Sequence, residues 1–282
     1  MSLENFKPTV WSAKLLKQLD ENYVLVGLCN RDYEGEITGA GDTVKINSIG
    51  DISVSDYNEN STSDISYERL DDAQTKLTID QQKYFAFEID DVDAAQANVD
   101  TMDRAMEKAG ISLDEVADSF VAGFHSDAGT TLVFTSTSTP FHEDNVNSIF
   151  QKIRQTFDEK SVPKSGRWVT LPPWAISKVN LAEIDAMTDN NDVISNNYNG
   201  TVAGVQIYMS NNLSTMSSTR SNQCHSLAGR SEAMSFAEQI VDTEALRREG
   251  SFKDAVRGLH VYGGKVTRPE QLINLEIEIG TS

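Results

Sequence analysis

The chain from Thr75 to Ile89 alternates apolar and polar side chains as a β-strand does. One face carries Leu77, Ile79, Gln81, Lys83, Phe85, Phe87 and Ile89. At about 3.3 Å per residue the run from Leu77 spans on the order of 40 Å, roughly twice the length of a common strand. The two polar residues in its middle interrupt the apolar face. The pattern predicts an unusually long strand that needs something to pack against.

The residues before this run predict a second strand and a hairpin. Gly39 and Gly41 precede short alternations that are interrupted by Gly50, as expected for a strand that bends. A polar and acidic stretch, residues 58–74, is too long for a plain loop in a compact domain. Two extended strands joined by an acidic tip predict an oversized hairpin from Gly39 to Ile89, with the three glycines as hinges.

Apolar residues at helical spacing predict four helices. A glycine at a helix C′ position, Gly110, and a capping box of Ser112 with Glu115 separate the second helix from the third. The predicted helices are Val10 to Asn22, a helix capped by Asp90 or Asp91 that ends at Gly110, Leu113 to about Ser126, and Asn145 to Lys160.

Short strands are predicted in the rest of the chain. The strand that begins at Arg167 is stopped by Pro172 and Pro173, which lead into a short helix. Residues 211–226 are predicted to be a polar loop. Further strands are expected within residues 202–210, 233–241, 255–267 and 274–279. Helices and scattered strands together predict an α+β fold.

Composition limits the class of protein. The 282 residues are 39% hydrophobic, enough to bury a core, and the net charge is −19. That charge argues against a nucleic-acid-binding groove, which needs clustered Lys and Arg. No apolar run is long enough to span a membrane, and the first residues lack the features of a signal peptide, so we expect the protein to stay in the cytoplasm where it is made.

Motifs of enzyme chemistry are missing from the sequence. We find no nucleophile elbow, phosphate-binding glycine loop, HExxH or calcium-loop spacing, and the four histidines lack metal-like spacing. Cys224 and His225 are the one pair that resembles a thiol nucleophile and its base, but they fall in the predicted polar loop without an orienting partner. Both cysteines, Cys29 and Cys224, are expected to be buried reduced thiols.

The order of elements resembles the major capsid (coat) proteins of tailed bacteriophages, the shell fold shared with herpesviruses. The resemblance covers nearly the whole chain. It rests on an N-terminal arm, a glycine-hinged hairpin, a spine helix from Leu113, and the phrase "NVNSIFQKIRQTFDEKSVPKSGRWVTLPPWAISKV". "NGTVAGVQIYMSNNL" and "FKDAVRGLHVYGGKVTRPEQL" are also similar to phage coat proteins.

The resemblance implies a division of the chain. Residues 1–30 would be the N-terminal arm, 31–90 the extended hairpin loop, and 91–143 a peripheral domain with the spine helix. Residues 144–255 would form an axial domain, and 256–282 would return to the peripheral domain.

It also implies a function. The protein would be a structural major capsid protein, without enzyme activity, cofactor or metal, that assembles through pentamers and hexamers into an icosahedral shell around double-stranded phage DNA. Its implied partners are other copies of itself, with portal and decoration proteins, packaged DNA near it only non-specifically, and no membrane. Shell curvature would be set either by a separate scaffolding protein or by an N-terminal segment that has already been cleaved off. It would be located in the virion after assembly in the host bacterial cytoplasm.

The long strand would then be covered by a neighbouring subunit. We expect Leu77, Ile79, Gln81, Lys83 and Trp11 to make contacts between subunits, while Phe85, Phe87 and Ile89 pack on the chain's own core. Leu77→Asp and Ile79→Asp should accordingly leave a folded subunit that no longer assembles. Three alternatives stay open: an ordinary sheet in a monomer, a phage tail-tube protein, and a cysteine hydrolase that uses Cys224 and His225.

Overall fold

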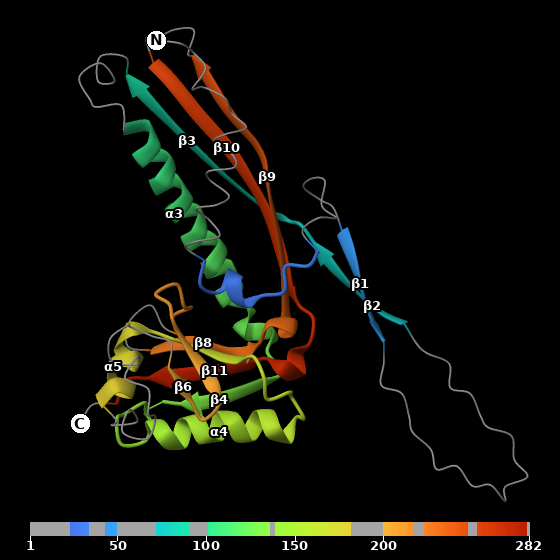
Figure 1. The fold of residues 1–282 in the computed structure, drawn as a ribbon, viewed down its shortest axis with the longest axis vertical. Helices are drawn as coiled ribbons and strands as arrows, with labels where there is room; N and C mark the ends of the chain where they lie inside the picture. Colours follow the sequence, from blue (N-terminus) through green and yellow to red (C-terminus); the bar gives the residue numbers. More distant parts are fainter. Residues whose placement is uncertain are drawn as a thin grey trace, which may run out of the picture.

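The computed structural model describes residues 23–33, 43–49, 72–90, 101–135, 139–181, 200–216, 223–247 and 253–280. Within these ranges the strands form three sheets, of two, three and six strands. Figure 1 shows a long three-stranded sheet beside helix α3, a six-stranded sheet beside helix α4, and a two-stranded hairpin that projects from the junction between them. The predicted α+β class is confirmed.

The long run that opens the sequence is two strands in different sheets. β2 (Asp72–Thr78) pairs antiparallel with β1 (Thr43–Ile49), and together they form the hairpin. After Ile79 and Asp80, β3 (Gln81–Asp90) pairs antiparallel with β10 (Lys253–Val266). The prediction of one hairpin from Gly39 to Ile89 is wrong in its second half, because β3 has its own partner far along the chain.

The three-stranded sheet, called the long sheet here, has the order β3-β10-β9, with β9 covering Met234–Arg247. Helix α3 (Thr101–Ala122) lies against one face of it. Phe85 and Phe87 of β3 stack with ring centroids 6.2 Å apart and pack against a cluster of Met106, Leu113 and Val256. The expectation that Phe85 and Phe87 belong to the chain's own core is confirmed.

Helix α3 runs unbroken through Gly110, so the predicted helix end and the new capping box at Ser112 are wrong. Its 22 residues extend about 33 Å. A glycine inside a helix costs only about 1 kcal/mol, and packing on both sides of Gly110, through Met106 and Leu113, outweighs it. The short 3-10 helix η4 (Gly123–Asp127) continues the chain from its end.

The six-stranded sheet has the order β4-β11-β8-β5-β7-β6. Its strands are β4 (Thr130–Phe134), β11 (Ile273–Glu278), β8 (Gln223–Arg230), β5 (Arg167–Leu171), β7 (Val205–Met209) and β6 (Thr201–Val202). The 3-10 turns η6 (Ser231–Ala233) and η7 (Pro269–Gln271) lie where the chain passes between this sheet and the long sheet.

Helix α4 (Val146–Glu159) confirms the prediction of a helix from Asn145 to Lys160, which are its two cap residues. The five apolar residues at helical spacing along it are buried: Val146, Ile149, Phe150, Ile153 and Phe157. The helix α5 (Pro173–Leu181) follows β5 directly after Pro172, as the double proline indicated.

Strand order crosses the expected segment boundaries. β4 and β11 fall in segments expected to be peripheral, yet both lie in the six-stranded sheet with β8. β9 lies wholly within the segment expected to be axial, yet it pairs in the long sheet with β10, most of which falls in the segment expected to return to the peripheral domain. The terms peripheral and axial refer to positions within a capsomer, which a single chain does not define. The two domains therefore stay predictions.

Candidate assembly surface

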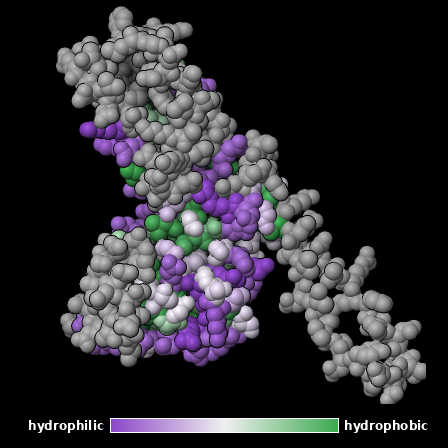
Figure 2. Space-filling view, viewed as in Figure 1, coloured by the Kyte–Doolittle hydropathy of each residue, from purple (hydrophilic) through white to green (hydrophobic). Residues whose placement is uncertain are grey.

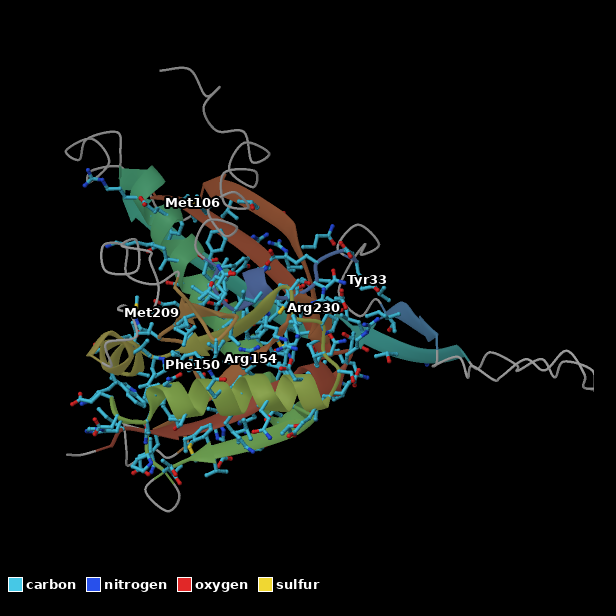
Figure 3. The ribbon with its side chains drawn as sticks, turned by 60° about the horizontal axis from the view of Figure 1, so that its bottom comes forward. Tyr33, Met106, Phe150, Arg154, Met209 and Arg230 are labelled. Carbon is cyan, nitrogen blue, oxygen red and sulfur yellow. The ribbon has the colours of Figure 1, made fainter. Side chains whose placement is uncertain are left out.

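The base of the hairpin is buried in the chain's own core. Leu77 and Ile79 have no exposed surface and pack with Val44 and Ile46 of the hairpin against Ala237 and Val261 of the long sheet. Tyr33, visible beside the hairpin in Figure 3, packs on this cluster. The expectation that Leu77 and Ile79 contact a neighbouring subunit is therefore wrong: their apolar surface is already covered within the subunit.

Among the described residues, none is found to cover the face of the long sheet that points away from α3 beyond the hairpin base. On β3 its residues are Gln82, Tyr84, Ala86 and Glu88, all exposed. Tyr84 is 79% exposed, the highest value among the large apolar or aromatic side chains described. In register across the sheet lie Leu259 beside Tyr84, and Arg257 beside Ala86. This face was not identified from the sequence, because only the odd-numbered positions of the strand were considered as contact residues. Tyr84, an aromatic residue among mostly polar even-numbered positions, was the available sign of it.

The same face carries exposed apolar side chains and an ion pair between β10 and β9. Arg257 donates to the Glu244 carboxylate of β9, with Nε at 2.8 Å from Oε2. Leu246, at the β9 register position opposite Ala255, is 37% exposed. We call this surface the outer sheet face; it consists of Gln82, Tyr84, Ala86 and Glu88 of β3, Ala255, Arg257 and Leu259 of β10, and Glu244 and Leu246 of β9. Its ion pair lowers the cost of covering it with another surface.

Other predicted contact residues lie at the start of β3. Gln81 is half-buried and its amide nitrogen donates to Asp80, 3.1 Å away, while Lys83 is exposed. Trp11 and the predicted hinges Gly39, Gly41 and Gly50 lie outside the described residues.

A buried polar cluster attaches the segment 23–33 to the long sheet. Glu238 of β9, almost fully buried, accepts from Arg31 Nη2 at 2.7 Å through Oε1 and meets His260 Nε2 at 2.9 Å through Oε2. The Tyr23 hydroxyl also donates to Glu238. Burial, followed by the charge of Glu238, raises the pKa of Tyr23 above its ordinary value. A buried carboxylate is tolerated here because three partners satisfy it.

The same segment is held from the other side by α3. The Asp118 carboxylate accepts backbone N–H groups of Val24, Leu25 and Val26 at 3.2, 3.0 and 3.0 Å. These donors stand at the start of the 3-10 turn η2 (Val26–Leu28). Burial raises the pKa of Asp118, and the hydrogen bonds from the backbone oppose that rise. The base of the hairpin is thus approached by a chain segment fixed to both α3 and β9.

Cys224 and His225 lie in strand β8 and not in the predicted polar loop. Successive side chains of a strand point to opposite faces, so the two cannot form a nucleophile–base pair. Burial raises the pKa of Cys224 to about 12, which keeps the thiol protonated. Burial likewise raises the pKa of Cys29, and both cysteines are free, as predicted. This geometry contradicts the cysteine-hydrolase alternative.

The described ranges contain neither a candidate metal site nor a candidate membrane-spanning helix. No group of three or more His, Cys, Asp or Glu side chains is placed to hold a metal ion there. None of the helices described is long and apolar enough to cross a membrane. Figure 2 shows a mainly hydrophilic surface beside α4, with hydrophobic residues gathered near the junction of the two larger sheets.

Comparison with known proteins gives one family and a consistent fold. The family model described as "Phage capsid protein" matches residues 74–275. A structure from Mycobacterium phage Che8 is 28% identical, covers 90% of this chain and 91% of that chain, and has a TM-score of 0.72. No curated protein matches the sequence.

Two more distant structures share the fold. The capsid structure of the cyanophage P-SCSP1u is 16% identical, with coverage of 86% and 85% and a TM-score of 0.65. A virus-like particle from Pyrococcus furiosus is 13% identical, with coverage of 95% and 98% and a TM-score of 0.58.

Proposed function

Because the chain belongs to the phage capsid protein family and has the structural role of a major capsid protein, we propose that its copies assemble through pentamers and hexamers into an icosahedral shell around double-stranded DNA. Separate scaffolding, portal and decoration proteins, and assembly in the host cytoplasm, belong to the same proposal. Its support is the resemblance over nearly the whole chain together with a surface suited to contact another copy.

The observation that carries this proposal is the outer sheet face with Tyr84 at its centre. An aromatic side chain that is 79% exposed in one subunit offers a large contact area at low entropic cost. Tyrosines are frequent among the residues that dominate protein interfaces. A second copy of this chain is the occupant we propose, because a capsid protein meets its own copies on several sides.

The projecting hairpin contributes to the same contact between two copies of the chain. A two-stranded ribbon is marginally stable alone in water and has unpaired strand edges. Its base is fixed by Leu77 and Ile79, so β1 and β2 extend away from the subunit at a set angle (Figure 1). We place the exposed side chains of Lys76 and Lys83 near acidic residues of a neighbouring copy, since the chain carries an excess of acidic residues.

Many weak contacts suit a shell better than a few strong ones. Each subunit is held by several neighbours, so that individual contacts of a few kcal/mol add up to a stable particle. The acidic charge keeps free subunits soluble and reduces adhesion to packaged DNA.

Substitution of Tyr84 tests this contact. Tyr84→Asp should give subunits with unchanged thermal stability that fail to form particles in sedimentation velocity, under conditions in which the unmodified chain does. Tyr84→Phe, which keeps the ring, is the matched control and should assemble. Normal assembly of Tyr84→Asp would contradict the contact, and tubes in electron micrographs of the unmodified protein would favour a tail-tube role.

A further inference from the structure

Two histidine rings stack at the junction between α3 and the six-stranded sheet. His125 of η4 and His225 of β8 have ring centroids 3.9 Å apart and planes inclined by 32°. His125 Nδ1 lies 3.2 Å from the carbonyl oxygen of Ala122, and His225 Nδ1 lies 3.2 Å from Oδ1 of Asn274. Because each Nδ1 can donate its proton to an oxygen, the second proton of either ring would add at Nε2.

The two histidines connect two parts of the fold. η4 connects the end of α3 to β4, the edge strand of the six-stranded sheet, and β8 lies two strands further in. The backbone of His225 is fixed, since its N–H donates to the Ser214 carbonyl at 2.8 Å. The stacked rings are therefore a direct side-chain contact between the connection from α3 and an inner strand of the sheet.

Among the described residues, few charged groups lie where they could compensate protonation of the two histidine rings. The titratable groups that act on His225 among the described residues are His125 from η4 and Glu276 from β11, its register partner. α3 contributes the carbonyl of Ala122, and the segment before β8 contributes that of Ser214. One partly exposed carboxylate can offset one imidazolium, but two imidazolium rings in stacking contact repel each other.

We propose that His125 and His225 form a pH-sensitive joint between α3 and the six-stranded sheet. The joint is closed while at least one ring is neutral, and it opens when both rings are protonated. Opening separates η4 from β8 and frees the angle between the long helix and the sheet. If the chain forms the shell proposed above, acid would loosen each of its subunits at this joint.

The direction of the pH effect follows from the environment of the pair. Burial, and after it the charge of His125, lowers the pKa of His225 from 6.5 in the folded chain. The unfolded chain then binds more protons than the folded chain over this interval. The contribution to stability is therefore complete above pH 6.5 and is lost as the pH falls through the lowered pKa.

Thermal unfolding of the full chain between pH 7.5 and 5.0 tests the joint. His125→Phe keeps an aromatic ring stacked on His225 but cannot take a proton, so its loss of Tm over this range should be smaller than that of the unmodified chain by roughly 2–4 °C. His142→Gln, which removes a histidine that lies before α4 and pairs with Asp144, is the matched control and should retain the full loss. If His125→Phe does not fold, His225→Gln serves the same purpose.

Proton NMR of the histidine rings gives a second, independent measurement. The His225 ring should titrate at higher pH in His125→Phe than in the unmodified chain, because the variant removes the charge of the neighbouring ring. Equal loss of Tm in His125→Phe and the unmodified chain, or an ordinary titration of His225 in both, would overturn the joint. These results do not depend on particle formation, so failure of the shell proposal and failure of the joint are distinguishable.

Discussion

Gly263 of β10 lies directly against the backbone of Ile79, where the hairpin leaves the long sheet. A methyl group placed on Gly263 would come within 2.8 Å of the Ile79 Cα atom and would overlap the Thr78 carbonyl oxygen. Glycine at this position allows the junction between β2 and β3 to cross β10 with backbone on backbone. The direction in which the hairpin projects therefore depends on a glycine, with no side chain, at position 263.

Gly263→Ala should destabilise the subunit by about 1–3 kcal/mol, since the atoms it meets are backbone and cannot move aside cheaply. Urea unfolding of the full chain measures this. Gly123→Ala is the matched control, because a methyl group there meets nothing within 4 Å, and it should change stability little. Equal stability of Gly263→Ala and the unmodified chain would show that the junction yields easily.

Replacing Ile79 by Ala should cost about 2–5 kcal/mol of unfolding free energy, because it removes a fully buried side chain from the cluster under the hairpin. Ile79→Asp and Leu77→Asp should impair folding itself, the reverse of what the sequence pattern indicated. Circular dichroism and urea unfolding distinguish the two outcomes. A fully folded Ile79→Asp subunit would return these residues to an intersubunit surface.

Glu238→Gln should lower stability by about 3–5 kcal/mol, because it removes the negative charge of a buried carboxylate that contacts Arg31, His260 and Tyr23. Glu244→Gln removes the carboxylate of the exposed pair with Arg257 and should cost no more than about 1 kcal/mol. Denaturant unfolding of the two variants compares the stability lost at a buried carboxylate with the stability lost at an exposed ion pair. Similar costs at both sites would mean that the buried cluster contributes little.

The strongest local patterns predicted structure correctly. Helix α4 has five apolar residues at helical spacing and buries all of them, and β5 ends where Pro172 removes a backbone donor. These signals lie within one element and need no knowledge of the rest of the chain.

What the sequence could not show depends on partners far away in the chain. β2 and β3 form one alternating run, and only the pairing of β3 with β10 and of β2 with β1 separates them. Gly110 has the residue type of a helix end, but packing of α3 on the long sheet keeps the helix continuous. For the same reason Leu77 appeared free to meet a neighbour, since Ala237 and Val261, which cover it, are more than 150 residues away.

Both cysteines should be unreactive in the folded protein. Ellman's reagent at neutral pH should modify neither Cys29 nor Cys224 until denaturant unfolds the chain, because both are buried and burial raises their pKa values. Cys224→Ala should leave assembly intact. Rapid modification of Cys224 in the folded protein would revive the hydrolase alternative.

In the shell proposed for this chain, the hairpin base belongs to its own subunit and the outer sheet face meets another copy. A cryo-electron microscopy reconstruction of the assembled protein tests it directly. We predict a closed particle in which Tyr84 is covered by a second copy while Leu77 and Ile79 stay packed against Ala237 and Val261 of their own chain. A particle with Tyr84 open to solvent, or with Ile79 inserted into a neighbouring subunit, would show that these two surfaces are wrongly assigned.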